Sequence, residues 1–169
     1  MPDADPGGGR DRDSAGRARN ARPRDALGRP LGRDAIGTPS LATDEALPPA
    51  QALQTAQRLL DTGRPFDAHD VLEAAWKAAP DAERDLWQGL AQLAVGLTHA
   101  RRGNARGAAT LLHRGAKRLA AYPDAGPYRI DVAGLRAASI ELADRIEASG
   151  LADLPLLSLT LCVPEAQDN

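Results

Sequence analysis

The segment from Asp81 to Arg102 constrains the fold of this chain more than any other, because apolar residues surround most of the helix that it is expected to form. They recur at helical spacing: Leu86, Trp87, Leu90, Ala91, Leu93, Ala94, Val95 and Leu97. A helix that is apolar on nearly every side must be enclosed by other elements. We therefore expect this helix to be the buried centre of an all-α domain.

Proline and glycine divide the rest of residues 45–150 into further amphipathic segments. Helices are predicted over 49–61, 65–79, 104–122 and 131–149, because proline suits a first helical turn and glycine suits the position after a helix end. The glycines that follow helix ends are Gly63, Gly103 and Gly150. The predicted fold class is all-α, with about five helices stacked as antiparallel hairpins.

The predicted helical domain, residues 45–150, has a different segment on each side. Residues 1–44 are rich in Gly, Arg, Asp and Pro and hold no aromatic residue, so a disordered tail is expected. Residues 151–169 are expected to be extended, since 157–163 alternate with period two. We expect this second tail to dock on the helices or on a second copy of the chain, which would form a homo-oligomer.

The N-terminal tail contains a short echo. Residues 24–28, Arg-Asp-Ala-Leu-Gly, are followed by Arg-Asp-Ala-Ile-Gly at 33–37. Two interpretations stay open for these runs. One is a solvated chain of mixed charge, and the other is a linear motif that lies along the domain or engages a partner.

The composition disfavours several classes of function. The net charge is only −2, and the chain after residue 44 is slightly acidic, so nucleic-acid binding is not expected. No apolar stretch approaches the length of about 20 residues that a membrane span needs. A single cysteine, Cys162, and the lack of a signal-peptide pattern make the cytoplasm the expected compartment.

A weak internal repeat supports the hairpin arrangement. When Gly63 is aligned with Gly103, Ala68 matches Ala108, and a leucine follows nine residues after each glycine. This pattern resembles the tetratricopeptide repeat, although the offset of 40 differs from the usual period of about 34 residues. A stacked helical scaffold of this kind would bind a protein or peptide partner.

Polar residues interrupt the predicted second and third helices. On a helical wheel of about 100° per residue, one side of the second helix carries Phe66, His69, Leu72, Glu73, Trp76 and Ala79, and the other carries Asp67, Asp70, Ala74 and Lys77. We therefore expect His69 and Glu73 to face the core. A buried carboxylate needs a partner, and Gln88, Gln92 and His99, which share one line of the third helix, are the predicted partners.

The same residues carry a family resemblance. The motifs are Phe66-x-Ala68-His69-Asp70-x-Leu72-Glu73-x-x-Trp76, then Leu86-x-Gln88-Gly89-Leu90-x-Gln92-Leu93-Ala94-Val95, then Gly103-Asn104-x-x-Gly107-Ala108. Together they resemble the domain of unknown function 309 family, small all-helical prokaryotic proteins that have been labelled predicted metal-dependent hydrolases. The family pattern usually has Glu where this chain has Asp70, whose shorter side chain changes its reach.

Three interpretations of the polar residues stay open. The first is a buried network of His69, Glu73, Gln88, Gln92 and His99 that only fixes the register of the helices. The second is a divalent metal site for hydrolytic chemistry, with His69, Glu73 and His99 as ligands and Asp70 in reserve. The third is a pocket for an organic ligand. The sequence thus leaves open whether the protein is an enzyme.

Overall fold

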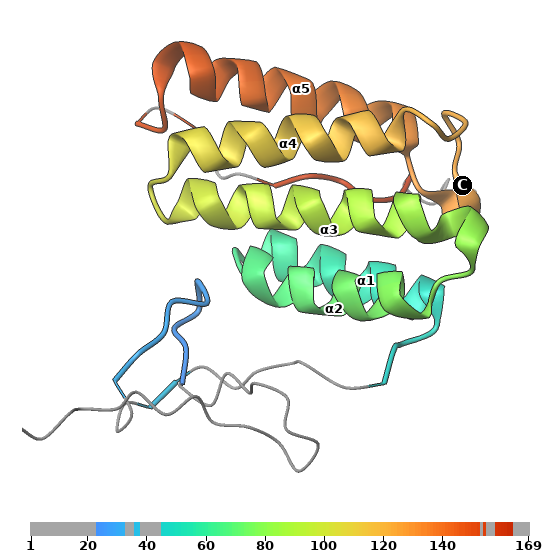
Figure 1. Ribbon diagram of the computed structural model, residues 1–169, viewed down its shortest axis with the longest axis horizontal. Helices are drawn as coiled ribbons and strands as arrows, with labels where there is room; N and C mark the ends of the chain where they lie inside the picture. Colours follow the sequence, from blue (N-terminus) through green and yellow to red (C-terminus); the bar gives the residue numbers. More distant parts are fainter. Residues whose placement is uncertain (1–22, 33–35, 38–44, 153, 155–157, 164–169) are drawn as a thin grey trace, which may run out of the picture.

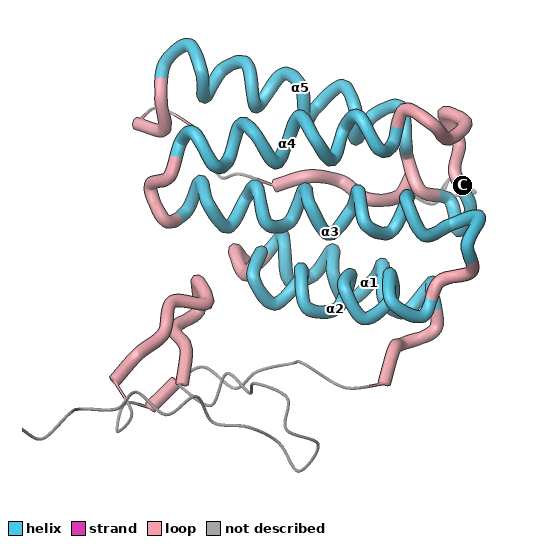
Figure 2. Tube along the Cα trace, in the orientation of Figure 1, coloured by secondary structure: helices cyan, strands magenta, loops and turns pink. Residues whose placement is uncertain are grey.

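The computed structural model describes residues 23–32, 36–37, 45–152, 154 and 158–163. The part of residues 1–44 outside 23–32 and 36–37 is not described, so the predicted disorder there lies outside the described residues. Within them the regular structure is helical, and no strand is drawn (Figure 2). The all-α prediction is confirmed. None of these helices is long and apolar enough to cross a membrane.

The helices are arranged in chain order, and each packs against the next (Figure 1). They are α1 (Pro49–Asp61), α2 (Pro65–Ala78), α3 (Asp81–Arg101), α4 (Ala105–Leu119) and α5 (Val132–Ser149), with a short 3-10 helix, η1 (Pro127–Arg129), before α5. The short turns between the first four make antiparallel hairpins, as predicted. Pro49 and Pro65 begin the first two helices, and Gly63, Gly103 and Gly150 have positive φ angles after helix ends.

Helix α4 is shorter than predicted and ends at Leu119 rather than near Tyr122. Tyr122 instead contacts the start of α3. The Tyr122 hydroxyl donates to the Ala82 carbonyl (3.0 Å) and accepts from the Leu86 amide (3.1 Å). Ala120 keeps helical backbone angles as the C-cap, and the chain then turns so that the tyrosine lies across the first turn of α3.

Helix α3 is the centre of the molecule, as its all-round apolar pattern predicts. Trp87, Leu90 and Leu97 on α3 are each no more than 1% exposed. On the side that faces α4, glycines permit close packing: a Cβ added to Gly96 would lie 3.0 Å from Leu112 Cγ, and one on Gly89 would lie 3.3 Å from the Gly115 carbonyl oxygen. The two central helices therefore pack closely where these glycines lie.

The C-terminal segment, residues 158–163, is extended and docks on the helices (Figure 1). Leu159 and Leu161 belong to the core and are 4% and 1% exposed. The Gln57 side chain of α1 donates to the Leu159 carbonyl (3.1 Å) and accepts from the Leu161 amide (2.8 Å). The amide of Asp131, just before α5, donates to the Leu161 carbonyl (3.0 Å). This segment thus connects the first helix to the last.

Residues 23–32 form an ordered turn near the start of α2 and the end of α3 (Figure 1). The first of the two repeated runs, residues 24–28, therefore lies along the helical domain, as one of the two interpretations expected. In the second run, Arg33 to Ala35 lie outside the described residues, and Ile36 is 99% exposed.

Candidate functional site

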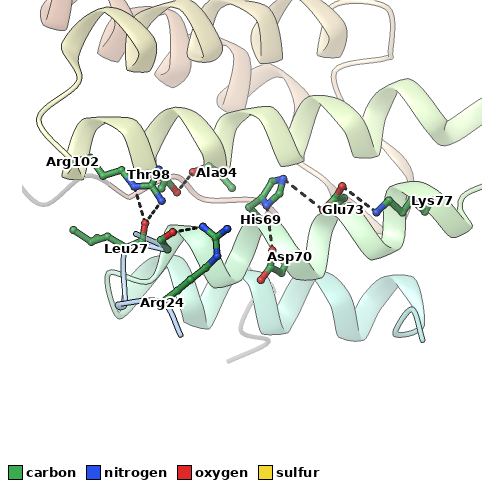
Figure 3. A network of polar contacts seen from close by, with 10 residues as sticks. Arg24, Leu27, His69, Asp70, Glu73, Lys77, Ala94, Thr98 and Arg102 are labelled. Carbon is green, nitrogen blue, oxygen red and sulfur yellow. Dashed lines mark hydrogen bonds and ion pairs between the residues drawn. The ribbon is translucent and has the colours of Figure 1, made fainter. Parts of the chain in front are cut away.

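Three potential metal ligands gather on one face of α2. A ring nitrogen of His69 and carboxylate oxygens of Asp70 and Glu73 all lie within 4.8 Å of one another. His69 Nδ1 is 3.4 Å from Asp70 Oδ1, and His69 Nε2 is 4.0 Å from Glu73 Oε2 (Figure 3). Lys77, one turn further along, lies 3.1 Å from Glu73 Oε1. His69 and Glu73 lie one helical turn apart and therefore share a face of α2, and the Asp70 carboxylate approaches the imidazole from the adjacent position along the helix.

The residues that α2 buries differ from those that the helical wheel predicted. Its buried residues are Pro65, Asp67, Ala68, Val71, Leu72 and Ala75. His69 and Glu73 are half-buried, with side-chain exposures of 24% and 33%, so they border the core instead of facing it. Asp67, expected on the outer side, is 4% exposed and pairs with Arg64 at 2.8 Å. The prediction that His69 and Glu73 face the core is therefore wrong, and Glu73 is partly exposed and pairs with Lys77.

One atom of the cluster lacks a hydrogen-bond partner among the residues that the structure describes. His69 Nδ1 is buried, and its contact with Asp70 has the distance of an ion pair but not the geometry of a hydrogen bond. Buried polar atoms are nearly always satisfied, so such an exception calls for a physical explanation. A cation bound to this nitrogen, beside the Asp70 carboxylate, would explain the missing hydrogen bond.

The two glutamines stay apart from this cluster in the described contacts. Gln88 and Gln92 are half-buried on α3, and no hydrogen bond joins either one to His69 or Glu73 within the described part of the chain. Gln92 Oε1 is itself buried and unpaired among the described residues. The glutamines therefore line α3 as predicted, but the hydrogen bonds expected from them are not observed.

His99 is also outside the cluster. Its Nδ1 lies 2.9 Å from Asn104 Nδ2, at the turn between α3 and α4. It is absent from both groups of potential ligands that the described residues form. Burial, and then the positive charge of Arg102, lower the pKa of His99. The ligand set that the geometry supports is therefore His69, Asp70 and Glu73, with Asp70 in the place predicted for His99.

A second group of potential ligands was not predicted from the sequence. His113 Nε2 on α4 lies 3.4 Å from Asp144 Oδ1 and 3.6 Å from Glu147 Oε1 on α5. Both carboxylates are exposed, with side-chain exposures of 63% and 59%. Such a surface arrangement is common for ordinary ion pairs, which contribute little on their own. No spacing along the chain links these residues, because only the packing of α4 on α5 brings them together.

A cavity of about 700 Å³ lies away from both groups. Residues of α1, of η1 and of the C-terminal segment line it, among them Arg58, Tyr128 and Cys162. Burial raises the pKa of the Cys162 thiol, which disfavours the reactive thiolate. None of the residues predicted for the site lines this cavity, so its volume and the polar cluster are separate features.

Comparisons with known proteins agree with the motifs. Residues 53–111, about a third of the chain, match the model of the family described as "Domain of unknown function (DUF309)". The "Uncharacterized protein YpuF" of Bacillus subtilis (strain 168) is 46% identical over 48 residues, which are 28% of this chain and 28% of that protein. The chain thus matches less than a third of that relative's length. No solved structure matches.

The matched region contains α2 and α3 complete, with parts of α1 and α4, and therefore all of His69, Asp70, Glu73, Gln88, Gln92 and His99. Residues 53–111 therefore match the DUF309 family, as the sequence motifs predicted.

Proposed function

We propose that this helical domain binds a divalent metal ion through His69, Asp70 and Glu73. The observation that supports the proposal is the buried His69 Nδ1, which has no hydrogen-bond partner among the described residues although two carboxylates lie nearby. A cation bound to one ring nitrogen of His69 would have both carboxylates within reach, because the three potential ligand atoms lie within 4.8 Å of one another. One nitrogen and two oxygen ligands suit Zn²⁺, Mn²⁺ or Fe²⁺.

The number of protein ligands favours a catalytic site over a purely structural one. Structural zinc sites are usually closed by four protein ligands, whereas catalytic sites keep a position open for water or substrate. A metal ion with an open position activates water and polarises a carbonyl or phosphoryl group. The side chains of the cluster are partly exposed, so solvent has access to them. Hydrolysis is thus the reaction class that we propose.

Lys77 has a defined role in this proposal. Its ammonium group lies 3.1 Å from Glu73 Oε1, and its own side chain is 67% exposed. An exposed ion pair is weak, so the lysine can leave Glu73 at little cost when a cation arrives. The ion pair would then hold the carboxylate in place while the metal is absent.

Metal titration of the full chain tests the proposal. Zn²⁺, Mn²⁺ and Fe²⁺ would each be added to metal-free protein, with binding followed by calorimetry and by the melting temperature. At least one ion should bind with one-to-one stoichiometry and raise the melting temperature, because a ligand of the native state stabilises it. His69→Ala should abolish both effects. His113→Ala, which removes the histidine of the other group, is the matched control and should leave them unchanged.

Glu73→Leu distinguishes a metal site from a merely structural cluster. The side chain is only half-buried, and leucine suits a helix, so the fold should be retained. In the proposed site the variant loses metal binding while its circular dichroism spectrum stays that of the wild type. A wild-type protein whose melting temperature responds to none of the three ions would refute the proposal.

A further inference from the structure

Residues 23–32 are held against the helices by a small set of specific contacts. The Arg102 guanidinium, at the end of α3, donates through Nε to the Leu27 carbonyl (2.8 Å) and through Nη2 to the same oxygen. Arg29 donates in return to the Arg102 carbonyl (3.2 Å). Arg102 therefore binds the turn through its backbone and through its side chain, whose contact with Leu27 is drawn in Figure 3.

Phe66, at the start of α2, forms the other half of this surface. Gly28 lies so close to the ring that an added Cβ would be 2.3 Å from Phe66 Cδ2. The guanidinium carbons of Arg24 and Arg102 lie 5.7 Å and 5.8 Å from the ring centroid, within the range of a cation–π interaction. The backbone of Gly28 thus packs directly on the Phe66 ring. Arg24 of the turn and Arg102 of the helical domain lie beside the same ring.

The conformation of the turn is fixed by its own hydrogen bonds. Asp25 Oδ1 accepts from the amides of Leu27 (2.9 Å) and Arg29 (2.8 Å), and the Asp25 carbonyl accepts from the Gly28 amide (2.9 Å). Gly28 has a φ of 71°, which glycine adopts without the cost that other residues meet. A ligand that is preorganised in this way loses little conformational entropy on binding.

The turn is not part of the hydrophobic core. Leu159 and Leu161 of the C-terminal segment belong to the core cluster, but none of residues 23–32 does. Polar and aromatic contacts hold the turn in place, and only Gly28 of the turn is buried. Polar and aromatic contacts with little apolar burial are typical of a recognition interface and not of a core. Removal of the turn from the helices should therefore leave the core of the domain intact.

We propose that Phe66 and Arg102 form a peptide-recognition site whose ligand is a turn of the pattern Arg-Asp-x-Leu-Gly. Residues 24–28 of the same chain occupy it in this structure, and the same turn on a separate peptide competes for it. The site needs an aspartate that closes the turn, a carbonyl for Arg102 and a glycine for the Phe66 ring. The proposal is independent of metal binding, although the rings of Phe66 and His69 are only 6.3 Å apart.

A labelled peptide of residues 23–32 tests the proposal on full-length chains. Gly28→Ala in the chain should empty the site, because the new Cβ would clash with Phe66 and the φ of Gly28 is unfavourable for alanine. Gly32→Ala is the matched control, since an added Cβ there has nothing within 4 Å. Asp25→Ala is a second variant that should empty the site by removing the hydrogen bonds of the turn.

The expected result is a difference in affinity measured by fluorescence anisotropy. A tethered ligand has an effective concentration on the order of millimolar, so the wild-type site is already filled and a separate peptide must compete. The Gly28→Ala chain should bind the peptide at least about tenfold more tightly than the wild-type and Gly32→Ala chains do. Adding Arg102→Ala to Gly28→Ala should weaken binding again by about tenfold or more.

Two outcomes would overturn the proposal. One is a Gly28→Ala chain that leaves the peptide unbound at about 1 mM, a concentration comparable to that of a tethered ligand. The other is binding of equal strength with Arg102 present and absent. A peptide that carries Gly28→Ala should fail to bind every chain, and its binding would count equally against the proposed recognition.

Discussion

His99 accepts a hydrogen bond from Asn104, the residue that caps the next helix. The Asn104 Oδ1 accepts from the Gly107 amide (2.9 Å), which leaves its Nδ2 as a donor to His99 Nδ1 at 2.9 Å. Because an amide nitrogen cannot accept, the histidine nitrogen must be unprotonated at this position. One asparagine side chain therefore joins the last turn of α3 to the first turn of α4.

This arrangement predicts a stability that depends on pH. Burial, and secondarily Arg102, lower the pKa of His99 below its ordinary value of 6.5. Below pH 6.5 the unfolded chain therefore binds a proton at His99 more readily than the folded chain does. The contribution of His99 is thus fully present above pH 6.5 and is lost as the pH falls toward the folded pKa. Melting temperatures from pH 8 to pH 5 should fall less steeply for His99→Gln, and equal slopes would contradict this prediction.

Asn104→Ala should lower the free energy of unfolding by about 1–2 kcal/mol, because the helix loses its N-cap and His99 loses its partner. Urea denaturation measures the change. Asp131 caps α5 through the Gly134 amide at 2.9 Å and offers a comparison within the same chain. Asp131→Ala should show only the capping loss, so an Asn104→Ala effect no larger than that of Asp131→Ala would argue against an added role for His99.

Arg64→Ala should destabilise the fold by about 2–3 kcal/mol, because it leaves the buried Asp67 carboxylate without its charged partner. The ion pair is 2.8 Å long, and the Asp67 side chain is only 6% exposed. The double variant Arg64→Ala/Asp67→Ala removes both charges and should recover part of the loss. Chemical denaturation of the single and double variants measures the coupling, and purely additive effects would show that the pair does not matter.

Lys77→Ala should strengthen metal binding at the proposed site. Lys77 contacts Glu73 Oε1, so an incoming cation must displace it from that carboxylate. Its removal should raise the affinity by about threefold to fivefold, the equivalent of an exposed ion pair. Calorimetric titration measures the change. Lys117→Ala removes the other lysine of the chain and should have no effect, and a weaker site after Lys77→Ala would contradict the assigned role.

Gly96→Ala should destabilise the protein although alanine is the better helix former. A Cβ at this position would lie 3.0 Å from Leu112 Cγ and 3.2 Å from the Leu112 backbone nitrogen, so α3 and α4 must separate slightly. Overpacking of this kind costs about 1–3 kcal/mol. The higher helix propensity of alanine over glycine offsets only about 1 kcal/mol of that loss. Thermal denaturation decides the sign, and a raised melting temperature would show that the helices adjust freely.

The helices were predictable because their ends are encoded locally. Pro49, Pro65, Gly63 and Gly103 each act on the backbone of their own turn, so no tertiary information is needed. The end of α4 was missed because a distant contact, from Tyr122 to the start of α3, decides it. Local signals therefore fixed most boundaries, and the exception depends on packing.

The site was only partly predictable, for two physical reasons. The wheel of α2 gave weight to large residues such as Phe66 and Trp76, whereas the helix buries its small residues Ala68 and Ala75 closely against its neighbours. Contacts between helices, such as that of His113 with Asp144, depend on how the helices pack and leave no trace in spacing. The proximity of His69 and Glu73 could be predicted because both lie on one helix, one turn apart.

The docking of Leu161 beside Gln57 has a consequence for the order in which the protein can fold during synthesis. These residues are 104 positions apart, and the later one lies among the last described residues of the chain. Helices α1 to α5 can pair with their neighbours as they emerge from the ribosome, because each contacts the next. The surface of α1 beneath Leu159 and Leu161 stays uncovered until translation has passed residue 161. A chain truncated before residue 158 should therefore expose this apolar surface and aggregate.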